Sequence, residues 1–150
     1  LKLRKKYLKK RILILDMQGE IVFSTSKREE LVDINGKVEE IVSKSGVKEG
    51  ICCVFAAHAT GAIIINENYD HNVCIDVISA LEKLIPAGKW EHDSVDGNGD
   101  AHIKSAVVGA SETVPIHEGK LQMGTWQSLG FLEFDGPRSK RKVIVKIIKS

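Results

Sequence analysis

Residues 51–66 read Ile51-Cys-Cys-Val-Phe-Ala-Ala-His58-Ala-Thr-Gly-Ala-Ile-Ile-Ile-Asn66, two apolar runs separated by a short polar turn. Runs of four to eight apolar residues, rich in β-formers, are typical of strands buried on both faces. The sequence therefore predicts strands over 51–57 and 62–65. His58 ends the first strand, and Asn66 and Glu67 follow the second, so polar side chains stand at the ends of buried elements.

Working outward, the chain contains further strand-like segments that are mostly joined by short turns. We predict strands over 20–25, 29–34, 111–117, 120–126, 127–134 and 142–149. The first two are interpreted as a hairpin across Ser26-Lys27-Arg28, and His117-Glu-Gly-Lys120 is typical of a tight hairpin connection. Because hairpins outnumber the long crossovers of parallel sheets, we expect an α+β fold. Its core is predicted to be a mainly antiparallel β-sandwich, with two or three helices packed outside.

Helical periodicity indicates three helices. The first follows Asn35, a predicted N-cap, and ends at Gly46. The second lies between Glu67 and Ile85 and is stopped by Pro86, which cannot continue a helix. A loop over 88–100 precedes the third helix, 101–108, for which Asp100 is the predicted N-cap.

Length and composition predict one domain over residues 1–150, large enough to bury a core. The net charge is only +2, so the whole chain exerts no general attraction on nucleic acid. The apolar run Ile12-Leu-Ile-Leu15 is too short to span a membrane. We therefore expect neither nucleic acid nor membrane as a partner.

Residues 1–16 precede Met17 and are interpreted as an N-terminal extension. The three cysteines, Cys52, Cys53 and Cys74, form no CxxC pair, which favours reduced, buried thiols in a cytoplasmic protein. Because neighbouring residues in a strand point to opposite faces, Cys52 and Cys53 are not expected to bind one ion together.

Three histidines are candidates for a functional site: His58, His92 and His102. Each lies in a turn-like segment or at the end of an element, near carboxylate or amide groups. Imidazole titrates near neutral pH and ligates metals, and three imidazoles with one open position would suit a catalytic Zn²⁺. Their spacings of 34 and 10 residues match no short metal-binding motif, so spacing alone favours ordinary loop histidines.

Two further segments allow two interpretations each. Asp100 either only caps the helix that follows it, or marks a helix N-terminus that binds an anion with His102 and Lys104. Trp126 either packs in a core or an interface, or forms an aromatic wall for a planar ligand to which Gln127 hydrogen-bonds.

Taken together, the motifs resemble those of the YjbQ-like family, over roughly residues 20–149. The resembling segments are Glu30-Leu-Val-Asp-Ile34, Val47-Lys-Glu-Gly50, His58-Ala-Thr-Gly-Ala62, Ile65-Asn-Glu-Asn68, Ala101-His-Ile-Lys104, Gly124-Thr-Trp-Gln127 and Glu133. The resemblance implies an α+β fold with a β-sandwich core that assembles as a homotrimer. It also implies a pocket near the subunit interface in which histidines bind a divalent metal, zinc or a similar ion, or an anion such as phosphate or sulfate.

The family is credited with a weak thiamine-phosphate synthase activity, which joins an aminopyrimidine diphosphate to a thiazole phosphate. By position, the resemblance assigns His58, His92 and His102 to the metal. It makes His58, Glu67, Asp100 and His102 catalytic candidates, and Asn66, Lys104, Trp126 and Gln127 substrate-binding candidates. The alternatives are a trimer that binds a small phosphorylated metabolite without turnover, and a metal-dependent hydrolase.

The chain departs from the family pattern at three places. Ala59 and Gly61 stand where Thr and Ser or Ala are commoner, which is expected to widen the turn after His58. The segment 128–132 replaces one that usually carries Gly and Tyr, and residues 1–16 have no clear counterpart.

Overall fold

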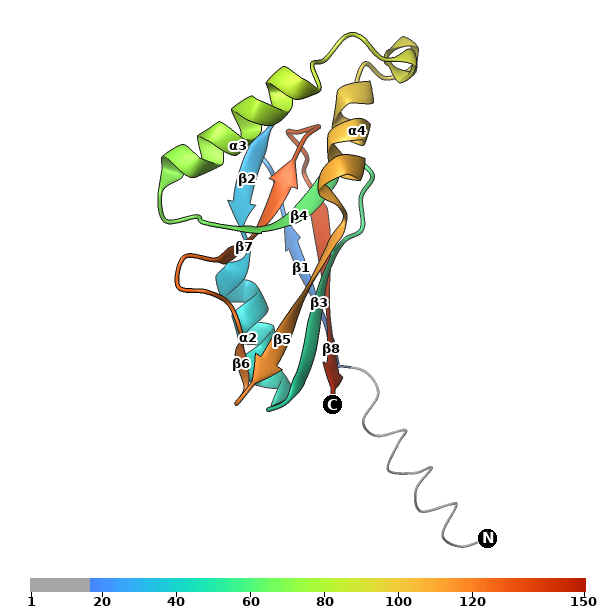
Figure 1. The fold of residues 1–150 in the computed structure, drawn as a ribbon. Coiled ribbons are helices and arrows are strands. Elements are labelled where there is room, and N and C mark those ends of the chain that lie inside the picture. Colours follow the sequence, from blue (N-terminus) through green and yellow to red (C-terminus); the bar gives the residue numbers. More distant parts are fainter. Residues whose placement is uncertain (1–16) are drawn as a thin grey trace, which may run out of the picture.

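The computed structural model describes residues 17–150, so the extension predicted at residues 1–16 lies outside the described residues. The strands form two antiparallel sheets (Figure 1). The larger sheet has the order β1 (Met17–Phe23), β8 (Arg141–Lys149), β3 (Gly50–Ala56), β5 (Ser111–His117) and β6 (Lys120–Leu121). The smaller sheet has the order β2 (Glu30–Asp33), β7 (Ser128–Glu133) and β4 (Gly61–Asn66). The predicted antiparallel α+β fold is confirmed.

One core joins the two sheets. Val54 and Val145 from the larger sheet and Ile63 and Phe131 from the smaller one are each fully buried in the same cluster. Along β8 the buried residues alternate with more exposed ones, as a strand with one face toward a core requires. On β3, Cys52 is buried whereas Cys53 is partly exposed, and all three cysteines are free thiols.

The predicted hairpin between the first two strands is wrong. β1 pairs with β8, and β2 pairs with β7, so the two strands belong to different sheets. The connection between them crosses from one sheet to the other, where the Thr25 amide donates to the Arg138 carbonyl at 2.8 Å. The local alternation of apolar and polar residues predicts a strand but not the strand with which it pairs. Here both partner strands come from the C-terminal part of the chain.

Helix α2 (Asn35–Ser45) belongs to the main core through Val38 and Val42. It ends at Gly46 with φ +68°, the left-handed conformation expected of a glycine at this position. Asn35 is not its N-cap. Instead, Ile34 occupies that position, and the Asn35 side chain accepts a hydrogen bond from the Leu129 amide at 3.2 Å, which ties the helix to β7.

Helix α3 (His71–Leu84) begins four residues later than the earliest predicted start, because Asp70 caps it by accepting from the Asn72 amide. Its residues Val77, Ile78 and Leu81 pack beside Ala62 and Leu132, so it covers one face of the smaller sheet (Figure 1). No helix within residues 17–150 is long and apolar enough to cross a membrane.

Helix α4 (Gly99–Val108) begins at Gly99 and takes Asn98 as its N-cap residue, so the prediction that Asp100 caps this helix is wrong. The expected loop before it contains one turn of 3₁₀-helix, η1 (Glu91–Ser94). Ser105 of α4 donates to the Gly61 carbonyl at 2.7 Å, which fixes the helix beside the start of β4.

The hairpin after β5 is confirmed, with Glu118 and Gly119 at φ values of +51° and +78° between paired residues His117 and Lys120. The strand predicted over 120–126 is shorter than expected: β6 is only two residues long. Gly124 and Gln127 then form a turn in which each backbone amide is bonded within the turn.

Candidate functional site

His58 lies at the end of β3, where its ring is fixed by the neighbouring strand. Its Nε2 accepts a hydrogen bond from the Lys142 amide at 2.8 Å, so this nitrogen carries no proton and Nδ1 carries it in the neutral ring. Burial lowers the pKa of His58, and the nearby Arg141 guanidinium lowers it further. His58 is therefore a neutral imidazole that offers a donor, and its accepting nitrogen is already used.

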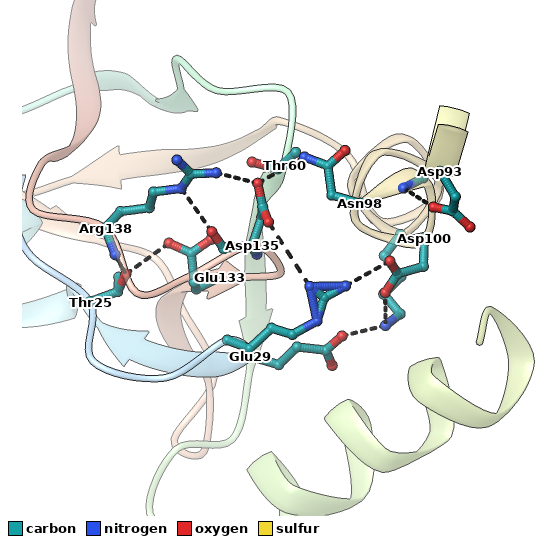
Figure 2. Close-up of polar contacts among 12 residues, drawn as sticks. Thr25, Glu29, Thr60, Asp93, Asn98, Asp100, Glu133, Asp135 and Arg138 are labelled. Atoms are coloured by element: carbon teal, nitrogen blue, oxygen red, sulfur yellow. Dashed lines mark hydrogen bonds and ion pairs between the residues drawn. The ribbon is translucent and has the colours of Figure 1, made fainter. Parts of the chain in front are cut away.

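A buried carboxylate supports the turn that carries His58. Glu133 is fully buried and accepts from the Arg141 Nε at 2.7 Å. It also accepts from Thr25 Oγ1 at 3.0 Å (Figure 2). Arg141 also donates to Thr60 Oγ1 at 3.0 Å, which fixes the turn between His58 and Gly61. Burial alone would raise the pKa of Glu133, but the hydrogen bonds from Arg141 and the Asp135 amide outweigh it and lower that pKa.

His92 and His102 lie together. Their ring centroids are 4.8 Å apart, and the rings meet edge to face at 84°. His92 comes from η1 and His102 from the first turn of α4, two elements that contact each other. His92 Nε2 also lies 3.7 Å from the Asp96 carboxylate. Two of the three predicted imidazoles are thus neighbours.

The residues of one chain do not fit the predicted three-histidine metal centre. Within residues 17–150, no group of three or more histidine, cysteine, aspartate or glutamate side chains is placed to hold a metal ion. His58 pairs with Phe131 instead, at a ring-centroid distance of 6.4 Å, and uses Nε2 within the protein. Metal binding by these histidines stays a prediction.

Asp100 and Lys104 belong to a buried cluster of ion pairs. Lys104 Nζ is 1% exposed and contacts Asp100 Oδ2 at 3.0 Å and the Glu29 carboxylate. Asp100 in turn accepts from the Arg28 guanidinium at 2.8 Å (Figure 2). Burial alone would raise the pKa of Asp100, but the hydrogen bonds from Arg28 and Lys104 lower it. In a single chain Lys104 thus holds α4 against the segment before β2.

The N-terminus of α4 is also engaged. The Gly99 amide donates to Asp93 Oδ1 at 2.8 Å, and the Trp90 amide donates to the other oxygen of the same carboxylate. Beside it, Asn98 Nδ2 donates to Asp135 at 2.9 Å (Figure 2). A protein carboxylate therefore already occupies the place that the anion-binding interpretation gave to a ligand.

The remaining candidates lie in two exposed loops. Asn66 ends β4 and Glu67 follows it, and the Asn66 side chain accepts from the Glu67 amide at 2.8 Å. Trp126, in the turn before β7, meets Tyr69 edge to face at a centroid distance of 5.9 Å. Tyr69 is 87% exposed and Trp126 is 63% exposed, so these aromatic rings face solvent. Gln127 folds back to accept from the Gly124 amide.

The candidates thus form two groups at opposite ends of β4. His58 lies three residues before Gly61, the start of this strand. The pair His92 and His102 lies on η1 and α4, of which α4 is bonded to Gly61. These three histidines are called the histidine group only because of this place in the fold. The loop group begins at Asn66, the last residue of the strand. Six residues of strand span roughly 16–20 Å, since each advances about 3.3 Å. Figure 1 shows the same arrangement, with α4 and the β4–α3 connection at different ends of β4.

Sequence reasoning missed Tyr69, Arg28, Glu29 and Arg141. Tyr69 could have been found, because a large aromatic residue inside the polar segment 66–70 is a signal for binding. The other three had no such signal, since their partners are far along the chain: Arg28 pairs with Asp100, and Glu29 with Lys104. Arg141 stands among other basic residues in the sequence, a setting typical of a solvated face, yet it is buried against Glu133.

Comparison with known proteins gives a consistent result. The family model described as UPF0047 protein YjbQ-like matches residues 19–150. A UPF0047 protein of Methanocaldococcus jannaschii is 47% identical over 137 residues, which cover 91% of this chain and 98% of that protein. The UPF0047 protein YugU of Bacillus subtilis is 40% identical over 127 residues, covering 83% and 94% of the two chains.

Solved structures agree with the fold. The crystal structure of a YbjQ-like protein of unknown function from Sulfolobus solfataricus matches with a TM-score of 0.87 and 41% identity, over 89% of this chain and 97% of that one. A YjbQ/UPF0047 family protein from Clostridium acetobutylicum matches with a TM-score of 0.83 and 45% identity, over 87% and 99%. From the family model and these relatives, the chain belongs to the YjbQ-like UPF0047 family.

Proposed function

We propose that the protein is a thiamine-phosphate synthase-like transferase whose site is completed between subunits of a homotrimer. The observation that carries this proposal is the separation of the site candidates into two groups at opposite ends of β4. Neither group alone offers both an aromatic surface and adjacent imidazoles. A neighbouring subunit that presents its loop group to the histidine group would combine the two.

In the proposed reaction, the ring nitrogen of a thiazole phosphate attacks the methylene carbon of an aminopyrimidine diphosphate. A C–N bond forms, the C–O bond to the diphosphate breaks, and pyrophosphate leaves with the electron pair. Trp126 and Tyr69 offer a surface on which the pyrimidine can stack. Asn66, which pairs with Ser128 at the end of β4, and Glu67 after it would bind the amino group of the pyrimidine.

The histidine group would bind the leaving pyrophosphate. His92 and His102 offer neighbouring ring nitrogens, and His58 offers its Nδ1–H. Donors that meet developing negative charge in the transition state lower the barrier. Asp100 and Lys104 act in this proposal by holding α4, and so His102, in place.

An exposed apolar surface supports assembly. Ile51 and Phe55 of β3 project from the face of the larger sheet that is turned away from the core. Ile51 is paired with Ile148 of β8, which is about half exposed. No helix within residues 17–150 covers this face (Figure 1). Exposed apolar patches of this kind mark interaction surfaces, and a trimer would bury this one.

The test is to measure thiamine phosphate formed by the purified protein and its variants. His102→Ala and Trp126→Ala are each expected to abolish product. His117→Ala, which changes an exposed histidine paired with Glu49, is the matched control and is expected to keep activity. Stabilisation by phosphate or precursors without any product from the wild type would point to a binding protein instead.

Mixed trimers test the shared site. When His102→Ala and Trp126→Ala subunits are co-expressed, one of the three composite sites in each mixed ring receives an intact half from each neighbour. With equal expression and random assembly about three quarters of the rings are mixed, so activity should recover to about one quarter of the wild-type value. No recovery, with active wild type, would place the whole site within one subunit.

A further inference from the structure

A groove that the proposed reaction does not use lies between β2 and α3. Its volume is about 390 Å³, which is within the range of small-molecule sites. Leu31 from β2 and Ile75 and Ile78 from α3 give it an apolar lining. Glu29 and Glu82 line the same groove and give it an acidic character.

Glu29 holds a hydrogen-bond acceptor without a partner. Its side chain is only 7% exposed, and its Oε1 is paired with Lys104. Its Oε2 is buried, and no donor within residues 17–150 reaches it. Figure 2 shows that this second oxygen turns away from the lysine. Buried carboxylate oxygens are normally bonded, so this one indicates a place for a donor from outside the chain.

The charge of the groove points to the kind of donor. Lys104 is shared between Glu29 and Asp100. Burial raises the pKa of Glu29, and the negative charge of the exposed Glu82 adds to that rise. Glu30 is already satisfied by the backbone amides of Ser26 and Lys27. Lys27 also lines the groove and offsets part of the charge, but no cation within residues 17–150 forms an ion pair with Glu82.

We infer that this groove binds a small organic cation, a protonated amine on an apolar body. Its N–H donates to Glu29 Oε2, Glu82 attracts its charge, and Leu31, Ile75 and Ile78 contact its apolar part. A bare metal ion fits less well, because the described residues contain no group of three or more metal-ligating side chains. This inference does not depend on the proposed transferase reaction.

Three probes of one shape separate charge from hydrogen bonding. 2-Phenylethylamine carries both a charge and N–H donors, 2-phenylethanol carries no charge, and trimethyl(2-phenylethyl)ammonium carries a charge without N–H donors. Calorimetric titration of the whole protein should show binding of the amine and much weaker binding of the other two. In NMR spectra, the amine should shift the resonances of Leu31, Cys74 and Ile78. Equal affinity for all three probes would overturn the inference, as would shifts confined to other parts of the chain.

Variants then test the groove itself. Glu82→Gln should weaken amine binding by up to about five-fold, in the range of exposed ion pairs. Glu39→Gln makes the same charge change on the exposed side of α2 and should have no effect. Ser79→Phe should block the groove and abolish binding, with the fold checked by circular dichroism. If Glu82→Gln and Glu39→Gln bind the amine equally, or if Ser79→Phe binds it as the wild type does, the groove is not the site.

Discussion

At the scale of single residues, the environment of His58 decides its chemistry more than its motif does. The Lys142 amide occupies Nε2, and Phe131 packs against the ring. Such a histidine is fixed in one tautomer. Its Nδ1–H can donate a hydrogen bond, but it has no free ring nitrogen that could accept a proton. The same motif in another setting would allow a metal ligand, so the residue type alone does not distinguish the two roles.

The pKa of His58 gives a prediction on pH. Because burial lowers this pKa in the folded state, the unfolded chain binds the proton more readily below its own pKa of about 6.5. The stability that the neutral ring contributes is therefore present above about pH 6.5 and is lost as the pH falls through the lower folded-state pKa. NMR titration should show the His58 ring titrating below about pH 6.5, the ordinary value of an imidazole. A midpoint at or above about 6.5 would contradict this.

Gly61 is required by packing. A Cβ at this position would lie 2.3 Å from Cζ of the fully buried Phe131. We expect Gly61→Ala to destabilise the protein by about 1–3 kcal/mol, measured by urea unfolding. Gly36→Ala, on the surface of α2 with nothing within 4 Å of a new Cβ, is the control and should stabilise by about 0.5 kcal/mol. Equal effects of the two substitutions would contradict the role of Phe131.

At the scale of elements, α4 is positioned by charge as well as by apolar packing. Lys104 and Asp100 connect it to Glu29 and Arg28 in the segment before β2. Ser105 binds it to β4, and Asp93 fixes its first amide. These contacts place the helix that carries His102, so the histidine pair depends on residues that touch no ligand.

Removing the Lys104 charge should show this dependence. Lys104→Met leaves the Glu29 and Asp100 carboxylates buried without their shared cation, and we expect a loss of about 3–5 kcal/mol in the free energy of unfolding. Lys44→Met breaks an exposed pair with Glu40 and should leave the urea midpoint nearly unchanged. Similar midpoints for the two variants would argue against a structural role for Lys104.

Much of the element pattern could be predicted from the sequence, because it depends on local signals. The strands, the hairpin at Glu118-Gly119, the end of α2 at Gly46 and the stop of α3 before Pro86 are each encoded by neighbouring residues. Strand partners are not encoded in this way, and the predicted β1–β2 hairpin was therefore wrong. The cap of α4 was missed because Asp100 satisfies two cations from other segments instead of its own helix.

The candidate site was predictable only in part. His92 and His102 meet because they lie on adjoining elements ten residues apart. The burial of Lys104 depends on Glu29, which is 75 residues away in the sequence. No local sequence pattern predicts that this lysine is buried. The pairing of Tyr69 with Trp126 likewise joins two loops that are distant in the chain.

At the scale of the whole molecule, the apolar residues on the outer face of the larger sheet and the Tyr69–Trp126 pair are exposed in the part of the chain that the structure describes. The homotrimer proposed above would use the first surface for assembly and the second for the shared site. The mass in solution and the activity are then linked, because a separated subunit would hold only half of each site.

Phe55→Glu should break this link. The substitution places a charge in the apolar face. The mass measured by light scattering should fall from three times the 16.5 kDa chain mass to the mass of a single chain. Leu84→Glu changes an exposed apolar residue at the end of α3 and should leave the mass unchanged. A wild type of single-chain mass, or a Phe55→Glu protein that keeps the wild-type mass, would refute assembly through this face.

Because Cys52 and Cys53 point to opposite faces of β3, the labelling rate of Cys53 can measure how often subunits of the proposed trimer separate. Burial raises the pKa of the Cys52 thiol to about 12. At neutral pH this thiol is therefore protonated and does not react with alkylating reagents. Cys53, between Ile51 and Phe55 on the outward face, is shielded whenever another subunit covers that face. The rate at which iodoacetamide labels Cys53 in the wild type would then report how often subunits separate, without any substitution in the chain.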